Sequence, residues 1–587
     1  MSGICGWVGR ADPTTLDAML SAIAYRGDQT DREVSASGTL GYRWWGGRPG
    51  KSPGLHRDGA NIVACAGTLA PPVPSPAADL YRRLRTHAEP AHGLDDLDGA
   101  FAAAWWDAER GRLTLLRDPF GVRSLYYTVF EETFYFASEL KQLLAIPGLP
   151  VEPDPAALHK YLTFSFVPGE DVPIRGIRRL LPGHLLTYQA GRIETRPYFV
   201  LRETLDPDLA EQAVAVRRVR ERCQQAVMKR LNGEREVGLF LSGGIDSSGV
   251  AVWLKEAGVG VQAFSLDFGE RSVEREQAAQ VAEHLGLPLT FLPIAGQELQ
   301  APFWDLVWKL DLPFGDPVTG PQYLLGEAAH GAGLAAVFNG EGGDQLFGGW
   351  TNKPMIAAEL YADLFGRASP EERYLESYHR FYGREDNLYT PEFAASVGGA
   401  GQRRALLAPY LGEDAAAETF LNRVRLADVA LKGSQSILPR AERLANAWAL
   451  DLRVPLFDRA LAETAFSLPP RLKLHGASEK HILKLVLQRA LPHEIVWRRK
   501  YGMSVPISDW VLGPLAGLVD DLLGPGALAR RGLFQEAYVG PLRRGEPEPG
   551  ETRRRRLGEK LWALAMLEAW LRVFVDGRGR RPSGVAA

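Results

Sequence analysis

The feature that most constrains the fold is a regular alternation of strand-like and helix-like segments that begins near residue 208. Apolar runs at 237–241, 261–268, 289–294 and 334–338 predict strands, and helical patterns at 208–231, 248–257, 273–285 and 322–332 accompany them. Strands that alternate with helices of this length favour a doubly wound parallel sheet. Because ligands bind beyond the carboxyl ends of such strands, the loops after Leu241 and Phe338 are the first candidates for a site.

The first 200 residues have a different pattern. Short runs at 62–66, 113–116, 125–129 and 133–137 are apolar or alternating and are bounded by Gly, Pro or Asp, which predicts strands. This part is therefore expected to be a strand-rich α+β domain, whereas residues 355–580 are mostly helical by pattern. We expect two domains, 1–205 and 206–575, followed by a flexible tail at 576–587.

Composition excludes several classes of protein. Hydrophobic residues make up 45% and charged residues 24%, both near the globular average, so the chain is not predominantly disordered. The 68 basic and 71 acidic residues give a net charge of −3, which indicates no nucleic-acid or anionic-membrane surface. Three scattered cysteines are too few for a disulfide scaffold or a zinc site. With no targeting segment and no long apolar run, we expect a soluble cytoplasmic protein without a membrane segment.

The strongest local signal is the loop 242–248, with the sequence SGGIDSS, between a predicted strand and a predicted helix. Gly243 and Gly244 let the backbone approach an anion closely, and the N–H groups at the helix start can bind it. Asp246 would repel a phosphate unless it holds a magnesium ion that the phosphate also binds. A surface turn capped by Asp246 is the alternative, and the position between strand and helix disfavours it.

A second loop, 339–349 with the sequence NGEGGDQLFGG, follows another apolar run. Asp344 could supply a second carboxylate for the same magnesium ion, and glycines on both sides leave Glu341 open to a substrate. A single acidic, glycine-rich loop is more often a turn. Two such loops at neighbouring strand ends share one crevice, and this pairing makes the signal specific.

These motifs resemble those of a known family. The loop 242–248 is similar to the pyrophosphate-binding loop of ATP pyrophosphatases, and with 339–349 and 450–458 (LDLRVPLFD) it resembles the synthetase domain of class B asparagine synthetases. The stretches 117–127 (RDPFGVRSLYY) and 136–144 (FASELKQLL) resemble the glutaminase domain of that family. The resemblance implies an N-terminal four-layer Ntn-hydrolase-like sandwich, then a PP-loop α/β domain with a helical C-terminal part. It also implies that ATP activates a carboxylate as an acyl-adenylate, which an amine attacks.

The resemblance assigns roles by position. Asp246 and Asp344 match the Mg²⁺ ligands, and Glu341 matches the base that helps to deprotonate the amine. Lys500, in 497–502 (WRRKYG), matches a lysine that stabilises charge on the reacting phosphate; without the resemblance it would be taken for a solvated lysine in a basic run. A fixed cation would lower the barrier because adenylation builds negative charge at phosphorus. The matched ATP contacts are Leu241, Leu266, Asn339 and Gly340 for adenosine, and Ser242, Gly243, Gly244, Asp246 and Ser247 for phosphates.

The chain departs from the family at the glutaminase site. The position of the cysteine nucleophile is Ser2, and the family's Asn-Gly-Glu substrate loop reads Ala66-Gly67-Thr68. The arginine expected to bind the glutamine carboxylate aligns with Trp44, and only Asp98 is retained. Losing these partners would cost several kcal/mol of substrate binding, so we predict no glutaminase activity. Cys5 lies three residues beyond the nucleophile position, in a predicted buried strand, and is expected to be a structural thiol.

Without an ammonia supply, the amine is expected to arrive with the substrate. Two branches of the family fit: β-lactam synthetases, which resemble Gly-Tyr-Gly where this chain has Gly340-Glu341-Gly342, and lasso peptide cyclases. We interpret the chain as a lasso macrolactam synthetase that joins the N-terminus of a leader-cleaved core peptide to an acidic side chain. The expected partners are that peptide, a leader peptidase and a leader-binding protein. An ammonia-dependent asparagine synthetase and a ligase acting on a small metabolite stay open, and a non-catalytic protein is disfavoured because the acidic residues and Lys500 are all present.

Overall fold

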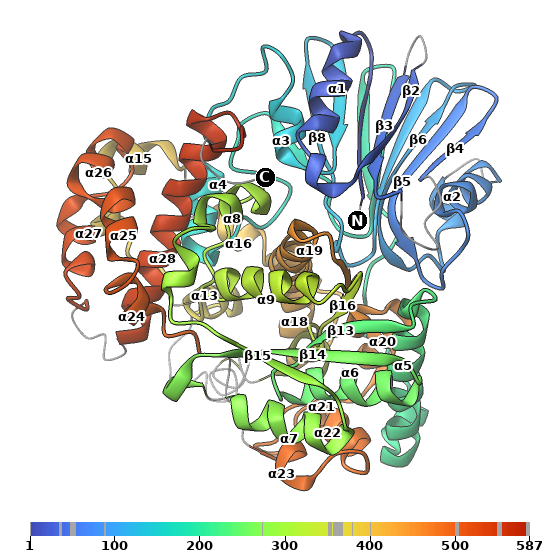
Figure 1. Cartoon of the computed structure of the whole chain (residues 1–587). Coiled ribbons are helices and arrows are strands. Elements are labelled where there is room, and N and C mark those ends of the chain that lie inside the picture. The colour runs from blue at the N-terminus through green and yellow to red at the C-terminus, as the bar shows by residue number, and fades with distance from the viewer. Residues whose placement is uncertain are drawn as a thin grey trace.

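The structure is a computed structural model that describes residues 2–34, 38–46, 54–86, 90–272, 274–349, 355, 368–378, 380–398, 401–498, 504–548 and 554–582. Figure 1 shows an N-terminal sandwich of sheets in blue and cyan, a twisted sheet in green below it, and a group of red and orange helices beside both. We refer to residues 2–197 as the sandwich and to the elements from residue 212 onward as the α/β part. Among the described residues, no helix combines the length and apolar character needed to cross a membrane.

Two antiparallel sheets, each of six strands within the described ranges, face each other in the sandwich. The first has the order β10-β8-β9-β1-β3-β2, with bounds β1 Ser2–Val8, β2 Gln29–Val34, β3 Gly38–Trp44, β8 Tyr126–Phe130, β9 Thr133–Ala137 and β10 Ile177–Arg179. The second has the order β12-β11-β7-β6-β5-β4, with bounds β4 Leu55–Asp58, β5 Asn61–Leu69, β6 Gly99–Asp107, β7 Arg112–Arg117, β11 His184–Gln189 and β12 Arg192–Pro197.

Helices on the outer faces of the two sheets complete four layers. Helices α1 (Pro13–Ser21) and α3 (Leu140–Leu144) pack on the first sheet, and α2 (Pro76–Arg85) packs on the second. Local sequence sets where helices begin, since Asp12 caps α1 and Asp154 caps α4 (Pro155–Phe164), each followed by a proline. The predicted sandwich is confirmed, and Cys5 is buried in β1 with its pKa raised by burial, as expected of a structural thiol.

The α/β part is built on a parallel sheet of five described strands in the order β15-β14-β13-β16-β17. Their bounds are β13 Glu236–Phe240, β14 Gly260–Asp267, β15 Leu289–Pro293, β16 Ala336–Phe338 and β17 Asp451–Arg453. The associated helices are α5 Gln212–Leu231, α6 Ile245–Glu256, α7 Arg275–Leu285, α8 Phe303–Leu310, α9 Thr319–Gly331 and α10 Gly343–Phe347. The doubly wound parallel sheet is therefore confirmed, with one strand, β17, that the sequence patterns did not predict.

Helices make up most of the described residues from 370 onward. They are α13 Pro370–Glu376, α14 Glu385–Leu388, α15 Pro391–Ser396, α16 Gly401–Ala405, α17 Ala408–Leu411, α18 Phe420–Ala427, α19 Leu438–Ala447, α20 Arg459–Ser467, α21 Pro470–Lys473, α22 His481–Leu487, α23 His493–Val496, α24 Ile507–Val511, α25 Ala516–Leu523, α26 Pro525–Arg531, α27 Glu536–Arg543 and α28 Arg554–Trp570. A π-helical segment, η7 (Asp428–Ile437), joins α18 to α19.

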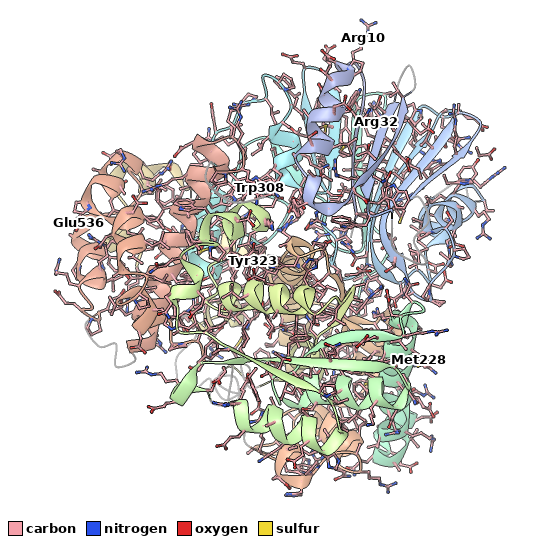
Figure 2. All side chains as sticks on the ribbon, viewed as in Figure 1. Arg10, Arg32, Met228, Trp308, Tyr323 and Glu536 are labelled. Atoms are coloured by element: carbon pink, nitrogen blue, oxygen red, sulfur yellow. The ribbon has the colours of Figure 1, made fainter. Side chains whose placement is uncertain are left out.

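The start of the expected flexible tail is instead packed against the fold. Arg578 donates a hydrogen bond to the carbonyl of Leu149 (2.8 Å), and Trp308 Nε1 donates to the carbonyl of Gly579 (2.9 Å). Arg581 pairs with Asp305 (2.8 Å). Figure 2 shows Trp308 on α8, where the α/β part meets the sandwich, and its ring centroid lies 5.3 Å from that of Tyr25. Residues 583–587 lie outside the described residues.

Candidate active site

The two glycine-rich loops emerge side by side from the parallel sheet. Strand β13 pairs with β16, with Gly238 opposite Val337 and Leu239 opposite Phe338. Because the strands are parallel and in register, the loops after Phe240 and Phe338 leave the same edge of the sheet. The expected juxtaposition of loops 242–248 and 339–349 is therefore present.

Two glycines allow the loops to touch. A Cβ atom on Gly340 would lie 2.5 Å from the backbone nitrogen of Ser247, and one on Gly343 would lie 2.1 Å from Asp246 Oδ1. Both distances are far inside van der Waals contact, so any larger residue would separate the loops. Asp246 and the segment that carries Asp344 are close because these positions have no side chain.

The first loop is arranged around its hydroxyl groups. Ser247 Oγ accepts a hydrogen bond from the backbone N–H of Ser242 (3.2 Å) and lies 3.1 Å from Ser242 Oγ. Gly244 is the N-cap of α6 and offers no side-chain oxygen to the first N–H groups of the helix. Those N–H groups and the positive end of the helix dipole suit an anionic ligand.

The carboxylates of Asp246 and Asp344 share a lysine that the sequence patterns did not reveal. Lys480 Nζ forms an ion pair with Asp246 Oδ2 and lies 2.7 Å from Asp344 Oδ1, and only 3% of its side chain is exposed. Burial alone would lower the pKa of Lys480, but the two carboxylates raise it above its ordinary value. The segment 478–484 (SEKHILK) resembles an ordinary helix start, and only the fold carries it to the two loops.

This donor set fits magnesium held together with phosphates. Among the residues the structure describes, no group of three or more histidine, cysteine, aspartate or glutamate side chains is placed to hold a metal ion. Mg²⁺ is usually bound by one or two carboxylates with its remaining ligands from substrate phosphates and water. Asp246 and Asp344 would be the protein ligands, and the ion would neutralise charge on the phosphate oxygens.

A crevice of about 310 Å³ opens between the loops, α19 and the segment after α21. Most of the sequence-predicted site residues line it: Leu241, Ser242, Gly244, Asp246, Ser247, Leu266, Asn339, Gly340, Glu341 and Asp344. Gly243 lies beside it, with its carbonyl accepting a hydrogen bond from Arg498 (2.8 Å). Lys480, Lys484 and Arg498 make this end of the crevice cationic. Lys500 lies outside the described residues, and the roles of all these residues stay predictions.

Glu341 lies in an environment that suits a base. Burial raises the pKa of its carboxyl group, and the nearby carboxylates of Asp344 and Asp246 raise it further, while Arg440 opposes the shift. A carboxylate with a raised pKa holds a proton more readily, so it is a better acceptor for the proton of an attacking amine.

The pocket at the amidase position is small. Its volume is about 40 Å³, enough for about three water molecules. Ser2, Tyr42, Trp44 and Thr68 are among the residues that line it, and Ser2 Oγ accepts a hydrogen bond from the N–H of Gly67 (3.1 Å). This volume leaves little space for an amide substrate.

The retained acidic residue of that site is engaged elsewhere. Asp98 pairs with Arg230 of α5 (3.4 Å), which also binds Asp458 (2.8 Å). Asp98 is 4% exposed, and burial together with the neighbouring Asp458 raises its pKa to about 7. Asp98 therefore connects the sandwich to the α/β part, and it is not free to bind the amino group of a substrate.

A parallel sheet with two adjoining glycine-rich loops and three nearby carboxylates fits the ATP-dependent carbon–nitrogen ligases, and the comparisons place the chain in that class. The chain belongs to the asparagine synthase family, whose model matches residues 218–572. A glutamine amidotransferase domain model matches residues 85–199. The sequence-based expectation of a class B asparagine synthetase relative is thereby confirmed.

Known proteins are similar over most of the chain. The glutamine-hydrolysing asparagine synthetase 1 of Bacillus subtilis strain 168 is 28% identical over 448 residues, covering 71% of this chain and 69% of that protein. Amidase chyE of Penicillium rubens is 27% identical over 503 residues, covering 73% of each chain. A solved allosteric regulatory enzyme of purine biosynthesis aligns with 50% of this chain and 80% of its own, at 13% identity and a TM-score of 0.27, too weak a likeness to bear on the fold.

Proposed function

We propose that this ligase is a lasso peptide macrolactam synthetase that uses ATP and Mg²⁺. The observation that carries the proposal is the contrast between its two sites: the crevice holds Asp246, Asp344 and Glu341, whereas the amidase-like pocket has Ser2, a volume of about 40 Å³ and its aspartate paired with Arg230. An enzyme without glutaminase activity would take its amine either from free ammonia or from its substrate, and a peptide N-terminus supplies one.

The residues of the crevice support each step of the reaction. A carboxylate oxygen of the substrate would attack the α-phosphorus of ATP, and the bond to pyrophosphate would break. The α6 N-terminus and Lys480 would bind the phosphates, with Mg²⁺ neutralising their charge when bound. The amine would then attack the acyl carbon, and AMP would leave. Glu341 would accept the amine proton, and the products would be the amide, AMP and pyrophosphate.

Pyrophosphate release with candidate substrates tests the proposal. A peptide with a free N-terminus and an internal acidic residue should give pyrophosphate and a product lighter by one water. The same peptide with an acetylated N-terminus should give no such product, because its nitrogen cannot attack. Pyrophosphate release and asparagine formation from aspartate and ammonium alone would contradict the cyclase proposal. A leader peptidase and a leader-binding protein belong to the proposal as partners, and their effect on the rate can be measured by adding each protein.

Two other ligase functions are alternatives. The asparagine synthetases among the relatives favour an asparagine synthetase, which without a working amidase site would use free ammonia, and a ligase for a small metabolite is the second alternative. Glu341 disfavours a β-lactam synthetase, because the motif of that branch has a tyrosine at the position of Glu341. A small-metabolite ligase would release pyrophosphate when its metabolite is added in place of the peptide, so the same assay distinguishes it.

A further inference from the structure

Helix α19 lies between the sandwich and the parallel sheet, as Figure 1 shows, and its two faces have different surroundings. Ala441, Leu444 and Ala445 line the crevice. Glu442 and Arg443 point to the sandwich, where Arg443 donates a hydrogen bond to Tyr126 Oη (2.8 Å). The helix is therefore one wall of the crevice and also part of the junction with the sandwich.

Arg26, Arg123, Glu442 and Asp451 form a buried charge cluster at this junction. Arg26 Nη1 and Nη2 lie 2.8 and 3.3 Å from the two carboxylate oxygens of Glu442. Arg123 also pairs with Glu442 and reaches Asp451 Oδ1 at 3.2 Å. All four side chains are 3–4% exposed. Buried ion pairs resist separation, because an acid left without its partner would be an uncompensated buried charge with a high free-energy cost.

The cluster also reaches the strand beside the second loop. Asp451 is the first residue of β17, which pairs with β16, and the N–H of Asn339 donates to the carbonyl of Arg453 at the end of β17 (3.2 Å). Glu341 lies two residues further along. Arg123 therefore bridges the crevice-lining helix and the strand that holds the Glu341 loop in place.

Arg123 itself is fixed from within the sandwich. Asp118 accepts hydrogen bonds from the backbone N–H of Arg123 (2.9 Å) and of Val122 (3.0 Å). Arg117 donates to the carbonyl of Arg123 (2.6 Å). The loop that presents Arg123 is thus built into the RDPFGVR stretch, 117–123, of the amidase-like sandwich.

We propose that the sandwich acts on the ligase reaction by holding the ATP crevice in shape, and that Arg123 and Arg26 are its positioning residues. The inference rests on the crevice being the ATP site and not on the identity of the acyl substrate. It gives the amidase-like sandwich a role that needs no amidase chemistry.

The test is ATP affinity in the Arg123→Met variant of the full-length protein, measured by calorimetry with MgATP. This variant should fold, because Glu442 keeps Arg26 and Asp451 keeps Arg453 at 2.8 Å. We expect MgATP to bind about tenfold more weakly, and Arg123→Lys to recover part of the loss. Glu442→Gln, which breaks the same bridge from the other side, should weaken binding in the same direction.

Leu115→Ala is the matched control, because Leu115 is fully buried within the sandwich and is not part of the cluster. It should lower the melting temperature and leave MgATP affinity unchanged. Wild-type affinity in both Arg123→Met and Glu442→Gln would overturn the inference, as would equal weakening in Leu115→Ala. Absence of MgATP binding by the wild-type protein would instead refute the ATP site itself, and with it the inference.

Discussion

Glu341 is the residue whose chemistry is easiest to separate from binding. If it accepts the amine proton, Glu341→Gln should slow amide formation by about 10²–10⁴-fold. Adenylation precedes that step, so ATP–pyrophosphate exchange should persist. Because the pKa of Glu341 is raised, the wild-type rate of amide formation should rise with pH through a value above that of an ordinary glutamate. Equal loss of exchange and amide formation would show that Glu341 acts earlier than we propose.

Asp98 makes folding stability depend on pH. Its pKa is about 7 in the folded protein against an ordinary 3.8, so the folded state retains the proton over that interval. The contribution of Asp98 to stability should therefore fall as pH rises from about 4 to about 7, by a few kcal/mol at most, and change little above pH 7. Asp98→Asn should remove this slope in urea unfolding curves, because an amide cannot ionise. Asp95→Asn, at an exposed neighbouring position, should keep the wild-type slope.

Asp246 and Lys480 show what a residue pattern can and cannot reveal. Asp246 could be found because the glycines and the strand–loop–helix context around it are local. Lys480 could not, because its role depends on the approach of a segment more than 200 residues away. The same reason applies to Arg230, whose contact with Asp98 joins two parts of the fold that are distant in sequence.

At the scale of an element, the second loop depends on residues with no side chain. Gly343→Ala should move Asp246 away from the loop that carries Asp344, since the added Cβ would lie 2.1 Å from Asp246 Oδ1. We expect pyrophosphate release to be lost while the circular dichroism spectrum stays native. Gly331→Ala is the matched control, because a Cβ there meets nothing within 4 Å and the residue lies in α9. Full activity in Gly343→Ala would contradict a metal or phosphate site shared by the loops.

The sequence patterns predicted most elements of the parallel sheet, but β17 was missed. It has three residues, two of them charged, and forms a strand only because Asp451 and Arg453 are neutralised in the buried junction. Helix α6 also begins earlier than predicted, at Ile245, because the glycine-rich loop ends directly in its first turn. Local patterns thus predict elements that are stabilised locally, and they miss those stabilised by distant partners.

At the scale of the whole molecule, the two sites should behave independently in one respect. Ser2→Ala should leave pyrophosphate release unchanged, because Ser2 lines only the small pocket of the sandwich and not the crevice. The wild-type protein should release no glutamate from glutamine in a coupled assay. Glutamate release that Ser2→Ala abolishes would show that the amidase-like pocket still works.

The packing of residues 578–581 has a consequence for how the chain is made. Arg578 binds the carbonyl of Leu149, 429 positions earlier, and Arg581 binds Asp305. These contacts can form only after residues 578–581 have been synthesised and have left the ribosomal exit tunnel, whereas the sheets of the sandwich can form much sooner. The contacts of Arg578 and Arg581 therefore join segments of the fold that leave the ribosome at different times.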